Sequence, residues 1–138
     1  MVRRRCDFIE ERDKEIMRRY AEIVRDRNCR TQKEALTYVV KSASTRFWVS
    51  PECLEKVIRY IKNGGDISNM SQTKQAMYNE LYHRYIKYRK ESKYAKMRLR
   101  HLCEILVEEI APEFYLLPET AMDIFNNMKK RRRRMITK

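Results

Sequence analysis

Apolar residues recur along this chain at the i, i+3, i+4, i+7 spacing that is typical of amphipathic helices. Leu36, Val39 and Val40 follow this spacing in one segment, and Cys103 and Leu106 begin the same pattern in another. The spacing predicts helices at about residues 7–27, 31–43 and 51–63, a fourth from about 71, a fifth ending by 111 and a sixth from 118. Because only two glycines and three prolines are available for turns, the chain is predicted to be all-α.

Local signals mark several of the expected helix ends. Residues 31–34 read Thr-Gln-Lys-Glu, a capping box in which the hydroxyl caps the first turn and the carboxylate reaches back. Ser50 and Pro51 predict the start of the third helix, since serine is a good N-cap and proline is tolerated at the first helical position. The Gly64-Gly65 pair ends that helix.

One short block of sequence occurs twice. Residues 47–52 read Phe-Trp-Val-Ser-Pro-Glu, and residues 114–119 read Phe-Tyr-Leu-Leu-Pro-Glu, an offset of 67 residues. The neighbouring apolar stripes match at the same offset, so we interpret the chain as a duplication of a three-helix unit. The alternative is a chance similarity between amphipathic helices.

The duplication leads to a definite expected architecture. We expect a single compact helical domain over residues 1–128, built from two tandem, helix-turn-helix-like repeats at about 7–65 and 71–128. Residues 129–138 are expected to form a flexible basic tail. The connection between the fourth and fifth helices is about six residues longer than its counterpart in the first repeat, and it is strongly basic.

The charge of the chain points to acidic partners. The formal net charge of the 138 residues is +13, which favours nucleic acid, an anionic membrane surface or an acidic protein. No apolar run approaches the roughly 20 residues that span a bilayer, and the first residues do not resemble a signal peptide, so a cytoplasmic location without membrane insertion is expected.

The cysteines and acidic residues give no sign of catalysis or metal binding. The four cysteines are scattered without a metal-ligand spacing, and no cofactor or metal is expected. The sequence contains no phosphate-binding glycine loop and no spacing typical of a nucleophile and its base. We therefore expect a protein that is not an enzyme.

Three groups of basic residues are candidates for binding nucleic acid. The first lies between residues 83 and 100, where tyrosines at 85, 88 and 94, with Tyr82 just before, are interleaved with the cations Arg84, Lys87, Arg89, Lys90, Lys93, Lys96, Arg98 and Arg100. The second is the basic run Lys129, Lys130, Arg131, Arg132, Arg133 and Arg134. The third is the outer face of the third helix, which would read DNA in a helix-turn-helix arrangement and carries Lys56, Arg59 and Lys62.

Each candidate has a simpler alternative, namely a solvated helix face or a soluble chain end, with tyrosines such as Tyr85 serving the core. Residues 44–52, followed by an amphipathic helix, resemble a sequence segment in small uncharacterised basic proteins of bacterial phages and mobile elements. That resemblance implies a setting and no activity.

The sequence as a whole favours non-catalytic binding of duplex DNA through phosphate contacts, with possible groove reading. A structural or protein-interaction module with an acidic partner, for example a phage particle component, and an RNA-binding protein are the alternatives.

Overall fold

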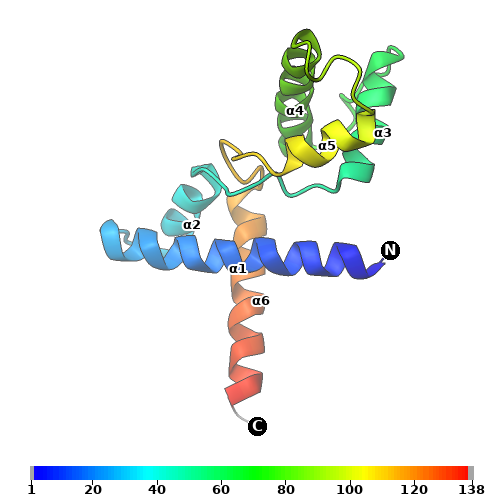
Figure 1. The fold of residues 1–138 in the computed structure, drawn as a ribbon. Helices are drawn as coiled ribbons and strands as arrows, with labels where there is room; N and C mark the ends of the chain where they lie inside the picture. Colours follow the sequence, from blue (N-terminus) through cyan, green and yellow to red (C-terminus); the bar gives the residue numbers. More distant parts are fainter. Residues whose placement is uncertain (1, 137–138) are drawn as a thin grey trace. The chain divides into compact units, whose positions relative to one another are not determined.

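The computed structural model describes residues 2–136, with side chains described for residues 9–134. The helices are α1 (Val2–Asp26), α2 (Gln32–Lys41), α3 (Pro51–Lys62), α4 (Gln72–Lys90), α5 (Leu99–Val107) and α6 (Pro118–Ile136) (Figure 1). The predicted all-α class with about six helices is therefore confirmed.

The predicted helix starts are confirmed by their caps. The Thr31 hydroxyl accepts a hydrogen bond from the Glu34 amide at 3.1 Å, and the Ser50 hydroxyl accepts one from the Cys53 amide at the same distance. Pro51 occupies the first position of α3, where its missing N–H costs the helix no internal hydrogen bond. The two capping bonds satisfy amides of the first turn that have no partner inside the helix.

The fifth helix ends earlier than the apolar pattern predicted. α5 stops at Val107, and Ile110, seven residues after Cys103 and so the next position of the apolar pattern, is 70% exposed. The Val107 carbonyl accepts a hydrogen bond from the Phe47 amide at 2.9 Å, so a residue from another part of the chain satisfies the helix end. Periodicity alone could not reveal this long-range partner.

The six helices form two compact units, and the grouping differs from the predicted one. Unit 1 comprises the chain up to Ser44 together with the part from Pro112 onwards, and therefore holds α1, α2 and α6; unit 2 spans Thr45–Ala111 and holds α3, α4 and α5. The prediction of a single domain of two consecutive three-helix repeats is therefore not confirmed. α2 and α3 belong to different units, so the predicted helix-turn-helix pair is not confirmed either.

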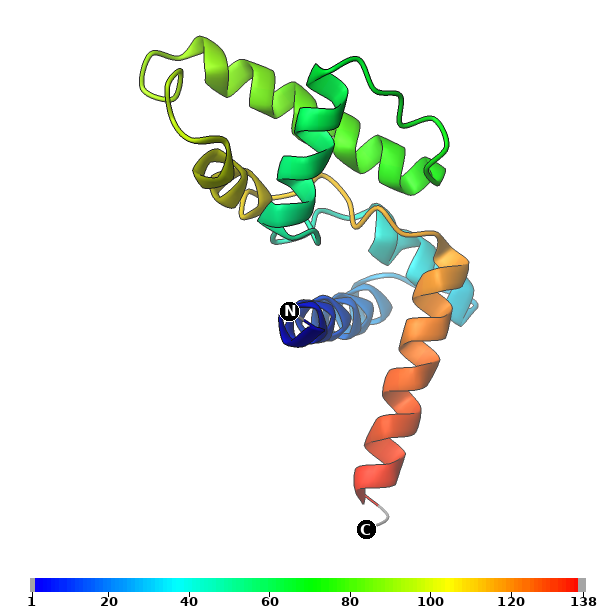
Figure 2. The ribbon, with the colours of Figure 1, turned by 90° about the vertical axis from the view of Figure 1, so that its right-hand side faces the viewer.

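Unit 1 is built around the inner faces of α1 and α2, against which α6 lies. Ile16 of α1 and Leu36 of α2 are fully buried, and Ala121 and Phe125 of α6 complete the core. The rings of Tyr20 and Phe125 are 4.2 Å apart between centroids. Figure 2 shows α6 running from the end of α2 past α1.

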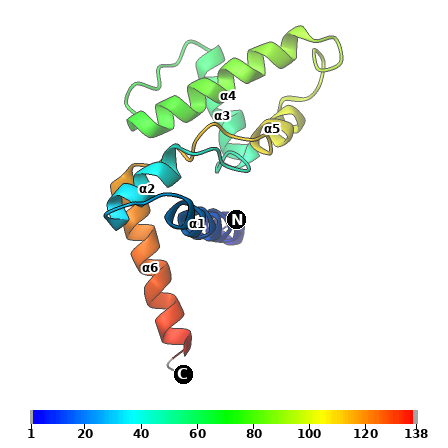
Figure 3. The same cartoon turned by 90° about the vertical axis from the view of Figure 1, so that its left-hand side faces the viewer.

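Unit 2 has a core of leucines and one phenylalanine from the preceding linker. Leu54 of α3, Leu81 of α4 and Leu102 of α5 are all fully buried, as is Phe47. Burial of such side chains is worth about 1.5–3 kcal/mol each, which is the main force holding α3 across α4 and α5. Figure 3 shows α3 crossing α4, with α5 beside it.

Each unit takes two helices from one repeat and the third helix from the other. The Phe47 amide donates to the Val107 carbonyl in unit 2, and the Phe114 amide donates to the Val40 carbonyl in unit 1, both at 2.9 Å. Residues 47 and 114 are equivalent in the repeat, and so are residues 40 and 107. We interpret the fold as an internal exchange of third helices between two related halves.

A pair of matching ion pairs fits this interpretation. Lys33 lies 3.8 Å from Glu119 in unit 1, and Arg100 lies 3.8 Å from Glu52 in unit 2. These positions are also equivalent in the repeat. Both acids lie in the first turn of an exchanged helix, α3 or α6, and both bases lie in the first turn of the helix that packs against it, α5 or α2. The exchanged helices α3 and α6 follow the linkers 42–50 and 108–117. Linkers of this length allow more than one partner for the helix that follows, so the sequence did not show the exchange.

The basic C-terminal run is helical where the sequence predicted a flexible tail. α6 extends through residues 129–136 without interruption, and residues 137–138 lie outside the described residues. Cations in the last turns of a helix interact favourably with its dipole, which helps the helix to continue.

Candidate nucleic-acid interface

Unit 2 brings together two of the three basic groups that the sequence singled out. α3 contributes one of them, and α4, α5 and the segment between them contribute the cations of residues 83–100. The cations that meet in this unit are Lys56, Arg59, Lys62, Arg84, Lys87, Arg89, Lys90, Lys93, Lys96, Arg98 and Arg100. The sequence had assigned these residues to two different repeats.

A carboxylate links α3 to α5 at the centre of this set. Glu55 accepts hydrogen bonds from Arg59 at 2.8 Å and from Arg100 at 2.7 Å. The Glu55 side chain is 14% exposed, whereas the Arg59 and Arg100 side chains are 63% and 50% exposed. Hydrogen bonds from Arg59 and Arg100 lower the pKa of Glu55, so the acid stays ionised and holds both guanidinium groups at the surface.

Cations from α3 and α4 also lie close to the ring of Tyr85. Tyr85 is buried, and its hydroxyl accepts a hydrogen bond from Arg89 Nε at 3.3 Å. The Lys62 ammonium lies 5.8 Å from the centre of the same ring. Burial acts to raise the pKa of Tyr85, but hydrogen bonds from Arg89 and Lys62 outweigh it and leave the pKa below its usual value. The Arg89 guanidinium lies 5.3 Å from the centre of this ring as well.

Arg84 and Arg89 serve the framework of unit 2. Arg84 bonds to Glu80 at 2.8 Å and to Glu109 at 3.1 Å, and its guanidinium lies 4.9 Å from the centre of the Phe47 ring. Arg89 donates to the carbonyls of residues 94 and 97, at 2.9 and 2.6 Å, and so closes the segment between α4 and α5. Their donors are largely used inside the unit, which leaves phosphate contact to the other cations.

The remaining cations between residues 83 and 98 are exposed. They follow one another from the last turn of α4 to the start of α5: Lys87, Lys90, Lys93, Lys96 and Arg98. Lys56 of α3 is exposed as well. Within the described side chains none of these six has an ion-pair partner, although Lys93 lies 5.3 Å from the centre of the Tyr94 ring. They are the residues best able to exchange water for phosphate oxygens.

The interleaved tyrosines are structural. Tyr88 donates a hydrogen bond to Glu109, which raises the pKa of Tyr88 to about 12, and its ring meets that of Tyr94 edge to face at 4.7 Å. Tyr82 is half-buried, with its ring 5.7 Å from that of Tyr85. Stacking of these rings on unpaired bases therefore has little support.

The remaining basic group, residues 129–134, belongs to unit 1. These residues of α6 are all exposed, and Lys129 lies 5.3 Å from the centre of the Phe125 ring. Met128, which is half-buried, is the last α6 residue with any substantial burial among the described side chains. The six cations therefore lie beyond the packed part of α6.

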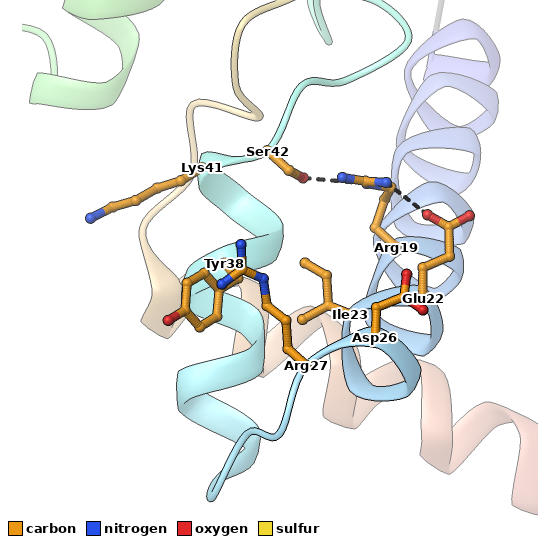
Figure 4. Close-up of a pocket in the computed structure, with 8 residues that line it drawn as sticks. All are labelled: Arg19, Glu22, Ile23, Asp26, Arg27, Tyr38, Lys41 and Ser42. Atoms are coloured by element: carbon orange, nitrogen blue, oxygen red, sulfur yellow. Dashed lines mark hydrogen bonds and ion pairs between the residues drawn. The ribbon is translucent and has the colours of Figure 1, made fainter.

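Unit 1 also contains an open cavity of about 360 Å³ between α1 and α2 (Figure 4). Arg19 donates to Glu22 of the same helix at 2.7 Å and to Ser42, at the end of α2, at 3.3 Å. The Arg27 guanidinium lies 4.3 Å from the centre of the Tyr38 ring. Because its acids and bases largely neutralise one another, the cavity is a weaker candidate for a polyanion than the surface of unit 2.

Other kinds of site find no support in the described residues. Cys103 is buried, and burial raises the pKa of its thiol to about 12, which leaves it unreactive at neutral pH. No group of three or more His, Cys, Asp or Glu side chains in the described part could hold a metal ion. The helices found there are also too short or too polar to cross a membrane.

The sequence missed the acids that organise the surface of unit 2. Glu55 lies four residues before Arg59, so their pairing was open to prediction. The bond from Glu55 to Arg100 was not, since it depends on the exchange of α3. The bond from Tyr88 to Glu109 joins residues 21 apart and depends on the segment after α5 packing against α4.

No protein-family model, curated protein or solved structure matches this chain. The resemblance of residues 44–52 to small proteins of phages and mobile elements therefore stays a prediction, and function has to be inferred from the geometry of the two units.

Proposed function

We propose that this protein binds duplex DNA without catalysis, through phosphate contacts made chiefly by unit 2. The observation that carries the proposal is the meeting of cations from α3 and from the α4–α5 region on one compact unit. The Glu55 bridge between Arg59 and Arg100 ties the two regions together. A surface assembled from three helices in this way can follow a phosphate backbone over several nucleotides.

The two kinds of cation on unit 2 would play different parts. Arg59 and Arg100 are held in place by Glu55, so they lose little freedom when they meet a phosphate. The exposed lysines from Lys87 to Lys96 are unpaired within the described residues and contribute mainly through release of counterions. Neither kind of contact reads sequence by itself.

Reading of bases by α3 as part of an α2–α3 helix-turn-helix does not belong to the proposal. The two helices lie in different units, and the turn between them is a linker of nine residues, 42–50. Shape and charge of the duplex are therefore the proposed basis of recognition.

Binding should be measured by fluorescence anisotropy with duplex DNA, single-stranded DNA and structured RNA, each at about 50 and 200 mM salt. The triple variant Lys87→Gln, Lys90→Gln and Lys93→Gln should weaken duplex binding at least tenfold. It should also reduce the slope of log affinity against log salt by up to about 0.9 for each phosphate that the protein no longer neutralises.

A matched variant controls for the loss of charge. Lys14→Gln, Lys41→Gln and Lys74→Gln remove the same three charges from exposed positions outside the proposed surface. If both triple variants weaken binding equally, net charge alone accounts for the affinity and the proposed surface is wrong. Tighter binding to structured RNA than to duplex DNA would favour the RNA alternative, and binding that is insensitive to salt would exclude the phosphate mechanism.

A further inference from the structure

The basic end of α6 is a cationic rod that extends beyond the core of unit 1. The packed part of α6 ends near Met128, and residues 129–134 that follow are all exposed. Figures 2 and 3 show that the last turns of α6 extend beyond α1 and have no helix of unit 1 beside them. The helix therefore continues for reasons other than packing.

The cations on this rod point in every direction around the helix axis. Successive residues of an α-helix are about 100° apart, so the four consecutive arginines 131–134 cover the whole circumference. Lys129 and Lys130 fill the turn before them. An amphipathic helix that lies on a membrane or on a flat protein surface carries its charge on one face and apolar residues on the other. This rod has no apolar face over residues 129–134.

A helix with charge all round suits a partner that surrounds it with anions. The major groove of B-form DNA is about 12 Å wide and is bordered by phosphates on both sides, and it admits an α-helix of about 10–12 Å diameter. The minor groove, about 6 Å wide, does not. The major groove of an RNA duplex is deep and narrow and is closed to a helix in the same way.

We propose that residues 129–134 of α6 enter the major groove of duplex DNA as a helix, with cations directed to the phosphates on both walls. The inference rests on the proposed function and adds to it a second contact, from unit 1. It replaces the sequence-based expectation of a flexible arm, which would suit the minor groove.

Repulsion between the charges of the rod is a physical reason for the helix to bind in a groove lined with phosphates. Like charges at i, i+4 on a helix repel each other, and residues 129 and 133 and residues 130 and 134 form such pairs. Phosphates on both sides would remove this repulsion. The helix should therefore be more stable on DNA than in solution.

Two substitutions at one position separate a helix from a flexible arm. Arg131→Ala and Arg131→Pro each remove the same charge, but proline takes away a helical hydrogen bond and its ring clashes with the carbonyl of residue 127. Position 131 lies beyond the core, so both variants should keep the thermal unfolding of the parent chain. Arg131→Ala should weaken duplex binding only a few-fold, whereas Arg131→Pro should weaken it by about tenfold or more, because residues 132–134 would no longer be held against the phosphates.

Methylation of the DNA by dimethyl sulfate identifies the groove. Guanine N7 faces the major groove and adenine N3 faces the minor groove. The parent chain and Arg131→Ala should protect guanine N7, and Arg131→Pro should lose part of that protection. Equal affinity and equal N7 protection for the two variants, or protection of adenine N3 that depends on residue 131, would overturn the inference while leaving the proposed function intact. Absence of duplex binding by the parent chain would overturn both.

Discussion

Units 1 and 2 are each built from three helices and differ in how they hold their positive charge. Each joins two helices of one repeat to the third helix of the other, and each fixes the incoming linker by a hydrogen bond from a phenylalanine amide, Phe114 or Phe47. At the positions equivalent to Glu55 and Arg59 of unit 2, however, unit 1 has Met122 and Asn126. The bridge that organises the surface of unit 2 is therefore missing from unit 1.

The difference separates scaffold from function. What the two units share are buried rings, hydrogen bonds from phenylalanine amides and a pair of weak ion pairs, all of which stabilise a three-helix fold. What they do not share are the basic features: arginines fixed by Glu55 in unit 2, and a protruding cationic helix in unit 1. Under the proposed function, these two basic features would give one duplex two different kinds of contact.

The exchange of third helices predicts that a chain cut between α3 and α4 stays together as one particle. A protease site inserted after Asn69, in the exposed segment between α3 and α4, would yield two fragments that hold three helices each. Since each unit needs helices from both fragments, the cleaved protein should elute from gel filtration as a single species of unchanged size.

The control for this experiment weakens both exchanged helices. Leu54→Asp places a charge on the buried face of α3, and Phe125→Asp does the same on α6, so the doubly substituted, nicked chain should separate into fragments. Separation without these substitutions, with each fragment folded, would mean that each repeat closes on itself and that the exchange is wrong.

The equivalent phenylalanines provide the next largest effect. Phe47→Ala and Phe114→Ala each empty a buried ring site and should each lower the free energy of unfolding by about 3–5 kcal/mol. Hydrogen exchange should show where the loss falls. Phe47→Ala should reduce protection of α4 and α5, in the other repeat, and Phe114→Ala that of α1 and α2. Loss of protection confined to the helices of the substituted repeat would contradict the division of the helices into units 1 and 2.

Some features of this fold could be predicted from the sequence, and others could not. The class, the helix count and the starts of α2 and α3 followed from spacing and caps, because those signals lie within a few residues of each other. Thr31 and Ser50 are of this kind. The choice of partner for α3 was not predictable, since Leu54 and Ile58 would bury equally well against either repeat.

The candidate surface was predicted in composition but not in geometry. The cations between residues 83 and 100 were evident one by one, yet Arg84 and Arg89 bond within the unit. Arg84 pairs with Glu80, four residues earlier on the same helix, but its bond to Glu109 and the bonds of Arg89 to backbone carbonyls become visible only in the folded chain. Charge can be counted from a sequence, but its availability depends on such long-range contacts.

The hydrogen bond between α4 and the linker after α5 should have a smaller effect on the free energy of unfolding, and this effect should depend on pH. Glu109 accepts from Tyr88 in unit 2, whereas the equivalent residue of unit 1, Ser42, accepts from Arg19. Tyr88→Phe removes one hydrogen bond to a charged group and should lower the free energy of unfolding by about 1 kcal/mol at neutral pH.

Alkaline titration should reveal the same bond. The pKa of Tyr88 is raised to about 12, chiefly by its hydrogen bond to Glu109, so its contribution is complete below the ordinary tyrosine value of 10 and is lost as the pH rises through 12. Urea unfolding at a series of alkaline pH values should show the parent and Tyr88→Phe converging over this range. Tyr82→Phe, on the same helix, is the control. A constant difference between parent and Tyr88→Phe would mean that the hydrogen bond does not form.

The smallest effect concerns the bridge that unit 1 lacks. Hydrogen bonds from Arg59 and Arg100 lower the pKa of Glu55 below its ordinary value of 4.5, so the stabilisation they provide is present above that value and is lost as the pH falls through the lowered one. Glu55→Gln should therefore be slightly less stable than the parent at neutral pH, and the two should become equal in acid. Glu108→Gln, which alters an exposed acid without an ion pair among the described residues, should show no such convergence. If Glu55→Gln and the parent differ by the same amount at about pH 3 and pH 7, then the carboxylate does not hold the two arginines, and the surfaces of the two units are more alike than their sequences suggest.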